Sequence, residues 1–297
     1  LVLIAGATQA AVVYSGNYDR KKHGAFTALN LKTTSDDDAA SLTWYYSLTN
    51  NGTDWTTSMP EFTDAGKTTV YYKVTADNHS DYTGSANVVI TSKDIGGAGS
   101  TLPASLADVY YTGSAITEKN DLIIRVAFGS DGHVLENTES VTEYTLTFTN
   151  NKNAGTATIT IAGSGNYTGT KSITFEILPV EFASVSATPY GGADGAEFDG
   201  AAHAVITSKT ANCIATAQAS DISSVKWEYS LVGGASATDW TTTMPEATDV
   251  ADGNTYYYRV SADNHVTKYG SVTVKIIPKD LSSAVINGGA AIADQTY

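Results

Sequence analysis

The sequence predicts an all-β protein built from tandem β-sandwiches, and three observations lead to this prediction. Short segments of alternating apolar and polar residues recur along the chain, turn-forming residues separate them, and a long internal repeat brings the same motifs back near the other end. Many short alternating strands with turns between them are typical of sandwiches. No window has the apolar spacing of a helix over about ten residues, so we expect helices to be short or absent.

The alternation is clearest in four segments. Residues 70–76 and their copy at residues 256–262 carry an apolar or aromatic residue at every second position, and residues 156–161 and 172–177 do the same in the middle of the chain. A period of two places one row of side chains in the core and the other in solvent. We therefore expect these segments to be strands that are buried on one face.

Turn-forming residues lie between the predicted strands. Asn50-Asn51-Gly52, Ser130-Asp131-Gly132 and Ser164-Gly165-Asn166 supply residues that tolerate a positive φ, as tight turns require. Short strands that are separated by such turns favour antiparallel sheets packed face to face.

The repeat includes the residues that would otherwise resemble a functional site. Asp54–Glu61 returns as Asp239–Glu246, and Ala76–His79 returns as Ala262–His265. A catalytic site needs one asymmetric set of residues, whereas an array duplicates whole modules with their Trp and His included. The sequence also has no Gly-rich phosphate loop and no metal-ligand spacing. We therefore predict that the protein is not an enzyme.

The spacing of the repeat predicts the domain organisation. Lys93-Asp94 returns as Lys279-Asp280, and the interval leaves room for two sandwich-sized units in each period. We predict one sandwich at residues 1–95, a second of a divergent type at 96–179, and a third of the first type at 180–280. Residues 281–297 then correspond to the first strand of a truncated fourth sandwich.

Charge and hydropathy exclude two classes of partner. The chain has 31 acidic and 17 basic residues, a net charge of −14, and the basic residues are scattered. Nucleic-acid binding needs clustered Lys and Arg, so nucleic acid is not an expected partner. No stretch approaches the ~20 apolar residues of a membrane-spanning helix, so membrane insertion is not expected either. An acidic surface that is rich in Thr, Ser and Tyr suits an extracellular module.

Several motifs resemble a known repeat family. The run Asn150–Ile161, followed by Gly165–Thr170, resembles the bacterial immunoglobulin-like repeats, including the MBG type, of large bacterial surface proteins. The outer units, with Trp44–Ser47 and Asp64–Gly66, are similar to the companion repeat of such proteins. The resemblance implies tandem immunoglobulin-like sandwiches in an extracellular, wall-associated or secreted protein that acts as a stalk or adhesin. It carries over no catalytic residue, because the family has no shared active site.

Trp55 and Trp240 are the candidate ligand-binding residues. They lie next to predicted loops at matched positions of the repeat, where an indole ring could stack on a sugar. The alternative is that both rings pack over a sheet edge. We expect Trp44 and Trp227, which lie in strand-like runs, to belong to the core.

Acidic loops are the candidate cation sites. Asp36, Asp37 and Asp38 are consecutive, and Asp249 and Asp252 are close in sequence, so each set places several hard oxygen ligands together, as calcium requires. The alternative is that both are solvated acidic loops, because charge runs usually lie in water. No other cofactor is expected.

The histidines favour a structural interpretation. His23 and His203 follow an aromatic-Asp pair at matched positions, and His79 and His265 end the matched Ala-Asp-Asn-His motifs. Duplicated histidines indicate loop structure rather than metal ligation or general base catalysis. His133 is unpaired in the repeat, and we expect it to be solvated in a hairpin turn.

Three hypotheses of function follow from these observations. The first is a structural spacer, whose sandwiches contact neighbouring modules of the same chain and hold a distal binding region away from the cell. The second is an adhesin whose modules bind a host glycan or protein around Trp55 and Trp240. The third is a self-associating filament subunit, in which residues 281–297 complete a sandwich of another copy by strand addition.

Overall fold

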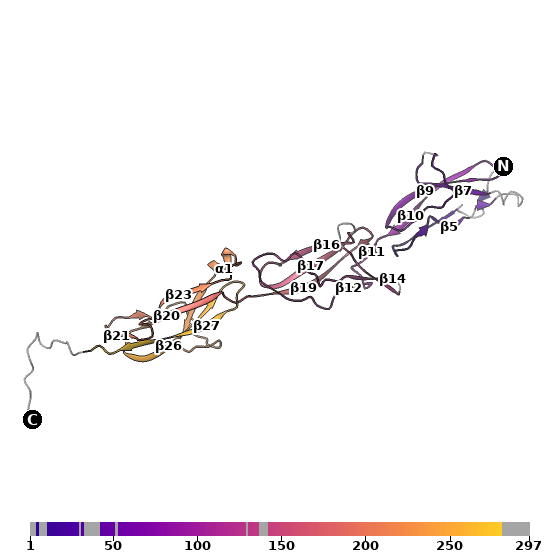
Figure 1. Cartoon of the computed structure of the whole chain (residues 1–297). Helices are drawn as coiled ribbons and strands as arrows, with labels where there is room; N and C mark the ends of the chain where they lie inside the picture. The colour runs from indigo at the N-terminus through magenta and orange to yellow at the C-terminus, as the bar shows by residue number, and fades with distance from the viewer. Residues whose placement is uncertain are drawn as a thin grey trace, which may run out of the picture. The chain divides into compact units, whose positions relative to one another are not determined.

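The protein is all-β and consists of tandem immunoglobulin-like sandwiches (Figure 1). The computed structural model describes residues 4–5, 11–29, 31–32, 42–50, 53–128, 130–136 and 142–280. Within this part of the chain the one helix is α1 (Ala219–Ser223), a single short turn. The predicted fold class is therefore confirmed.

The chain separates into two compact units. Unit 1 contains residues 1–107, 117–149 and 158–175, and unit 2 contains residues 108–116, 150–157 and 176–297. The division between them runs through the middle sandwich. The sandwich boundaries that the sequence predicts, at residues 95, 179 and 280, stay a prediction.

One four-stranded sheet occurs three times in the described residues. In the first sandwich its order is β3-β10-β9-β7, and the last strand in sequence, β10, pairs parallel with β3 and antiparallel with β9. The middle and third sandwiches repeat this arrangement as β13-β19-β17-β16 and β21-β27-β26-β24. The twelve strands are β3 (Ser15–Asn17), β7 (Thr43–Ser47), β9 (Gly66–Thr75), β10 (Tyr82–Thr91), β13 (Val109–Tyr110), β16 (Tyr144–Thr149), β17 (Gly155–Gly163), β19 (Thr170–Leu178), β21 (Ala196–Glu197), β24 (Lys226–Ser230), β26 (Ala251–Ser261) and β27 (Lys268–Ile277).

Shorter strands form the second layers and the connections. The pairs are β1-β6, β2-β5 and β4-β8 in the first sandwich, the sheet β12-β14-β15 in the middle one, and β20-β23 and β22-β25 in the third. A separate parallel pair, β11-β18, connects the first two sandwiches. The bounds are β1 (Ile4–Ala5), β2 (Ala11–Val13), β4 (His23–Gly24), β5 (Phe26–Leu29), β6 (Leu31–Lys32), β8 (Glu61–Phe62), β11 (Lys93–Asp94), β12 (Ser100–Thr101), β14 (Arg125–Phe128), β15 (Asp131–Val134), β18 (Tyr167–Thr168), β20 (Ser184–Pro189), β22 (His203–Ala204), β23 (Ile206–Asn212) and β25 (Glu246–Ala247).

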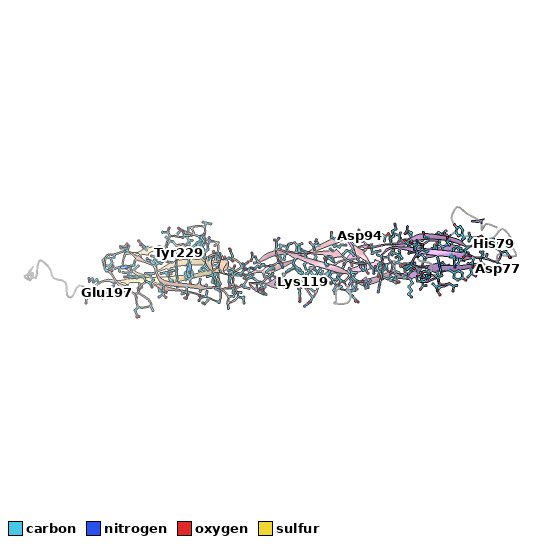
Figure 2. The ribbon with its side chains drawn as sticks, turned by 90° about the horizontal axis from the view of Figure 1, so that it is seen from above. Asp77, His79, Asp94, Lys119, Glu197 and Tyr229 are labelled. Carbon is cyan, nitrogen blue, oxygen red and sulfur yellow. The ribbon has the colours of Figure 1, made fainter. Side chains whose placement is uncertain are left out.

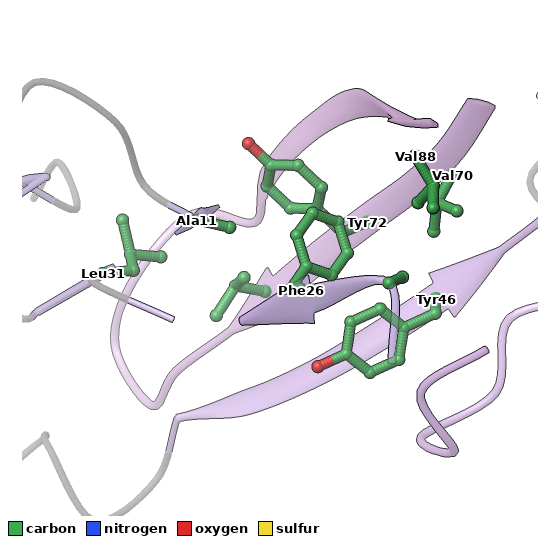
Figure 3. Close-up of a cluster of buried hydrophobic side chains, with 9 residues drawn as sticks. Ala11, Phe26, Leu31, Tyr46, Val70, Tyr72 and Val88 are labelled. Atoms are coloured by element: carbon green, nitrogen blue, oxygen red, sulfur yellow. The ribbon is translucent and has the colours of Figure 1, made fainter. Parts of the chain in front are cut away.

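The core of the first sandwich follows the predicted alternation (Figure 3). Val70, Tyr72 and Val74 are buried, and Phe26 packs edge-to-face on Tyr72 with ring centroids 5.5 Å apart. Full burial of such a side chain stabilises the fold by about 1.5–3 kcal/mol. Lys73, on the outer row, is only half-buried. The inward row of β17 in the middle sandwich is fully buried as predicted: Ala157, Ile159 and Ile161.

The third sandwich differs from the first by a β-bulge at the start of β26. Ala251 pairs with Ile276, as Gly66 pairs with Ile90 in the first sandwich, and the register then shifts before Asn254. A bulge adds one residue to one strand of a pair. The corner Asp64-Ala65 therefore corresponds in space to Asp249-Val250, which the irregular spacing of the repeat obscures.

Candidate functional site

The loops of the two candidate tryptophans are anchored in the same way. In each copy the residue after the tryptophan bonds to a tyrosine of the neighbouring strand through both backbone groups: Thr56 with Tyr46, at 3.0 and 2.7 Å, and Thr241 with Tyr229, at 2.9 and 2.7 Å. The Asp that precedes each tryptophan also contributes to the anchor. Hydroxyl groups donate to Asp54 from Ser47 and Thr49, and to Asp239 from Ser230. These hydrogen bonds hold the pKa of both carboxyl groups below the usual range.

A cation covers one face of each indole ring. Lys73 Nζ lies 5.6 Å from the ring centroid of Trp55, and Arg259 Cζ lies 4.9 Å from that of Trp240. Such cation–π contacts contribute about 0.5–1 kcal/mol at exposed sites. The ring of Tyr269 lies 5.9 Å from that of Trp240. These contacts favour packing over the sheet edge, and a ligand role for either tryptophan stays a proposal.

The other two tryptophans pack against the cores, as predicted. Trp44 lies 5.6 Å from the ring of Tyr72, and Trp227 lies 5.1 Å from the ring of Tyr258. Both are partly buried against the core clusters of the first and third sandwiches.

The candidate calcium ligands lie partly outside the described residues. Asp36, Asp37 and Asp38 lie outside the described residues. Asp249 is exposed, and the Asp252 carboxylate lies 3.2 Å from Lys275 Nζ. Over the ranges that the structure covers, no group of three or more His, Cys, Asp or Glu side chains could hold a metal ion. Calcium binding stays a prediction.

The matched histidines form matched structural contacts. His23 Nε2 lies 2.7 Å from Asp19 Oδ1, and His203 Nε2 lies 3.0 Å from Asp199 Oδ1. Each imidazole stacks on a tyrosine with ring centroids 4.1 Å apart, in the pairs His23 with Tyr14 and His203 with Tyr190.

The expectation that His133 is solvated is wrong. Its side chain is only 12% exposed, and Nε2 lies 2.9 Å from Glu143 Oε2. The hairpin places the imidazole against the carboxylate of Glu143, which lies just before β16, and the Asp-Gly turn sequence does not reveal this contact.

An asparagine connects the first and middle sandwiches. Asn166 lies in the turn between β17 and β18; its Oδ1 accepts a hydrogen bond from Ala65 N (2.6 Å), and its Nδ2 donates one to Asp64 Oδ1 (2.9 Å). The next residue, Tyr167, packs edge-to-face on Tyr18 with ring centroids 5.6 Å apart. These five residues all belong to unit 1, and we call them the first joint.

A second asparagine makes the same contact between the middle and third sandwiches. Asn264 lies in the turn between β26 and β27, and its Oδ1 accepts a hydrogen bond from Ala154 N (2.7 Å). The next residue, His265, packs on Tyr111 and Phe182, with ring centroids 6.5 and 5.0 Å away. These five residues all belong to unit 2, and we call them the second joint.

The connecting segments repeat the same backbone bonds. Lys93 N–H donates to Asn166 O (2.9 Å), and Val180 N–H donates to Asn264 O (3.0 Å). Each connection therefore adds a short parallel pairing beside the asparagine turn. In both joints the turn of one sandwich contacts the exit end of the preceding one, which we define as the end where its last strand finishes.

A buried carboxylate stabilises the second joint. Asp221, in α1, is 1% exposed and accepts hydrogen bonds from Tyr111 Oη (2.5 Å), Gln218 N (2.9 Å) and Asn264 Nδ2 (2.8 Å). Burial opposes ionisation of this carboxyl group, but the three donors outweigh it and lower its pKa. Burial raises the pKa of the Tyr111 hydroxyl group.

Both asparagines are contact residues that the sequence patterns do not reveal. They share one signal, because Asn precedes an aromatic or imidazole side chain in Asn166-Tyr167 and Asn264-His265. The sequence indicates only that both asparagines form turns, because their partners lie 101 and 110 residues away along the chain.

Comparisons with known proteins find a likeness to tandem extracellular domains. No family model matches the sequence, and no curated protein matches it. Extracellular domains 3-5 of Drosophila OTK align over 92% of this chain and 96% of their own, with 9% identity and a TM-score of 0.27. Immunoglobulin domains 1-5 of Sidekick-1 align over 91% of this chain and 58% of their own, with 7% identity and a TM-score of 0.28. The extracellular domain of protocadherin GammaB4 aligns over 98% of this chain and 52% of its own length, with 10% identity and a TM-score of 0.27. The chain therefore spans about half of that structure.

The strand order and register of the three four-stranded sheets define the fold. In the described part of the chain, no helix has the length and apolar character that a membrane span requires.

Proposed function

We propose that this chain is a non-enzymatic structural spacer of an extracellular surface protein, built from bacterial immunoglobulin-like repeats of the MBG type and its companion. In this function the sandwiches hold a distal binding region away from the cell surface. The observation that carries the proposal is that both joints use one set of contacts. An asparagine of one turn accepts a hydrogen bond from a corner N–H, an aromatic or imidazole side chain packs beside it, and a connecting segment pairs with the turn.

A spacer needs joints that resist bending, and the two asparagines supply specific contacts for this purpose. A hydrogen bond contributes about 1 kcal/mol net, which changes the ratio of closed to open joints about fivefold. Edge-to-face aromatic contacts such as Tyr18 with Tyr167 add about 0.5–1.5 kcal/mol. The net charge of −14 fits a solvated extracellular protein.

Removing the joint asparagines tests the spacer function. We expect Asn166→Ala and Asn264→Ala each to broaden the distribution of inter-sandwich distances in small-angle X-ray scattering, because each opens one joint. Asn78→Ala is the matched control, since Asn78 occupies the turn position of Asn264 in the first sandwich and has no hydrogen-bond partner among the described residues. Identical scattering of all three variants and the unmodified chain would contradict the proposal.

A second function, glycan binding, is favoured by one observation. Trp55 lines a surface hollow of about 490 Å³ together with Asn50, Tyr71 and Thr83. Aromatic faces beside amide and hydroxyl groups are typical of small-ligand sites. We expect any glycan that the chain binds on an array to be lost in Trp55→Ala and kept in Trp240→Ala, both with unchanged circular dichroism. If both variants still bind the glycan, this hollow is not the glycan-binding site.

The filament hypothesis concerns residues 281–297, which lie outside the described residues. Light scattering on the chain with and without this segment tests it, because strand addition predicts larger particles only when the segment is present.

A further inference from the structure

The exit end of the third sandwich has the backbone arrangement of the two exit ends that form joints. Phe198 N–H donates to Ile277 O (2.9 Å) at this end. Tyr18 and Tyr111 make the same bond to the last strand of their own sandwiches, at 2.8 and 2.9 Å. Figure 2 labels Glu197, the residue that precedes Phe198.

The corner beside Phe198 also corresponds to the corners in the joints. Through the bulge in β26, Asp249 and Val250 take the places of Asp64 and Ala65. In the first joint Ala65 N–H and the Asp64 carboxylate are the two groups that contact an asparagine side chain. Val250 N–H has no hydrogen-bond partner among the described residues.

This exit end differs from the other two because its apolar residues are exposed. Tyr18 and Tyr111 are 7% and 2% exposed, whereas the equivalent Phe198 is 36% exposed. Val250 is 48% exposed. Phe198 follows β21 and Val250 precedes β26, and these two strands flank β27, so both exposed side chains lie at the same end of one sheet. Apolar surface that is exposed at one place favours contact with a partner.

We propose that Phe198, Val250 and Asp249 form a docking surface for the Asn-Tyr turn of a further sandwich that follows in the chain. In this contact the asparagine Oδ1 accepts from Val250 N–H, its Nδ2 donates to the Asp249 carboxylate, and the tyrosine ring packs on Phe198. The inference rests on the proposed spacer function and deepens it, because it names the chemistry that extends the array.

The internal repeat indicates which type of sandwich docks at this exit end. Lys279-Asp280 matches Lys93-Asp94, and Lys93 N–H donates to the carbonyl group of Asn166 in the first joint. A segment that follows Asp280 in the same register leads to a sandwich of the middle type, whose turn carries Asn166-Tyr167. A joint within one chain also benefits from a high effective concentration of its two halves.

The test inserts a copy of residues 95–179 between Asp280 and Leu281 and retains the rest of the chain. Amide hydrogen exchange of Val250, followed by NMR with 15N-valine labelling, reports on the docking surface. We expect exchange to slow by at least about tenfold relative to the unextended chain. The matched control carries Asn166→Ala in the inserted copy only, and there we expect most of the protection to be lost.

Three results would overturn the proposal. The first is unchanged exchange of Val250 while the inserted copy shows protected amides in its own β17. The second is equal protection with and without the inserted asparagine. The third is protection in the unextended chain that rises with concentration, which would assign the surface to the Asn78 turn of a second copy.

A second insertion keeps the test decisive if the first one does not fold. A copy of residues 182–280 at the same place presents Asn264-His265, the turn that forms the second joint, and the same protection of Val250 is expected. The spacer function has its own readout, the scattering of Asn166→Ala and Asn264→Ala in the unextended chain. Failure of docking and failure of the spacer function are thus distinguishable.

Discussion

Replacing Asp221 with alanine is expected to lower the free energy of unfolding of the third sandwich by about 3 kcal/mol. The carboxylate is 1% exposed and accepts hydrogen bonds from Tyr111, Gln218 and Asn264. The substitution leaves these buried donors without an acceptor and removes the bond that begins α1. Urea denaturation followed by circular dichroism measures the change.

Asp263→Ala provides the control for this experiment. Asp263 is an exposed Asp in the turn between β26 and β27, and we expect its replacement to change stability by no more than about 0.5 kcal/mol. If Asp221→Ala lowers the free energy of unfolding no more than the control does, the buried carboxylate does not stabilise the second joint.

The effect of Asp221 also depends on pH, with a sign that follows from its lowered pKa. A carboxyl group whose pKa is lower in the folded state stabilises the fold above its unfolded pKa of about 3.9 and loses this contribution as the pH falls through the folded value. We therefore expect the difference between the unmodified chain and Asp221→Ala to be constant near neutral pH and to narrow below about pH 4. A difference that grows on acidification would contradict this sign.

Replacing Glu228 with glutamine is expected to lower the free energy of unfolding by about 2 kcal/mol at pH 7. Glu228 is 8% exposed; Arg259 Nε donates to one of its oxygens (2.7 Å) and Lys226 Nζ to the other (2.9 Å). These two bonds lower the pKa of Glu228 to about 2. Because Arg259 also covers Trp240, the variant should shift the tryptophan fluorescence of the third sandwich as well.

Acid titration separates this ion pair from simple packing. The stabilisation is present above the unfolded pKa of about 4.3 and is lost as the pH falls through the folded value of about 2, so the difference between Glu228→Gln and the unmodified chain should be much smaller at pH 2 than at pH 7. Glu246→Gln, at an exposed position, is the control and should have no effect at either pH. An effect of Glu228→Gln that persists at pH 2 would indicate lost packing instead.

Much of the fold could be predicted because its signals are local. Every second residue of 70–76 faces the core, and a period of two in the sequence is sufficient to show it. The bulge at Ala251 could not be predicted, because one extra residue in a strand changes register without changing the alternation further along.

The joints could not be predicted for a different reason. The turn at Asn166 is visible in the sequence, but its partner Ala65 N–H belongs to the backbone, which every residue except proline possesses. No local pattern identifies which of these groups an asparagine side chain reaches. The tryptophans were ambiguous in the same way, since only the structure places Lys73 and Arg259 over the rings.

Amide hydrogen exchange of Ala65 and Ala154 tests the central claim most directly, because these N–H groups donate to the two joint asparagines. We expect Asn166→Ala to accelerate exchange at Ala65 and not at Ala154, and Asn264→Ala to accelerate exchange at Ala154 and not at Ala65. Figure 2 labels Asp77 and His79, the neighbours of Asn78, at the end of the first sandwich away from Asp94, so Asn78→Ala should affect neither amide. Exchange at both amides that is unaltered by all three substitutions would contradict the claim that these asparagines join the sandwiches.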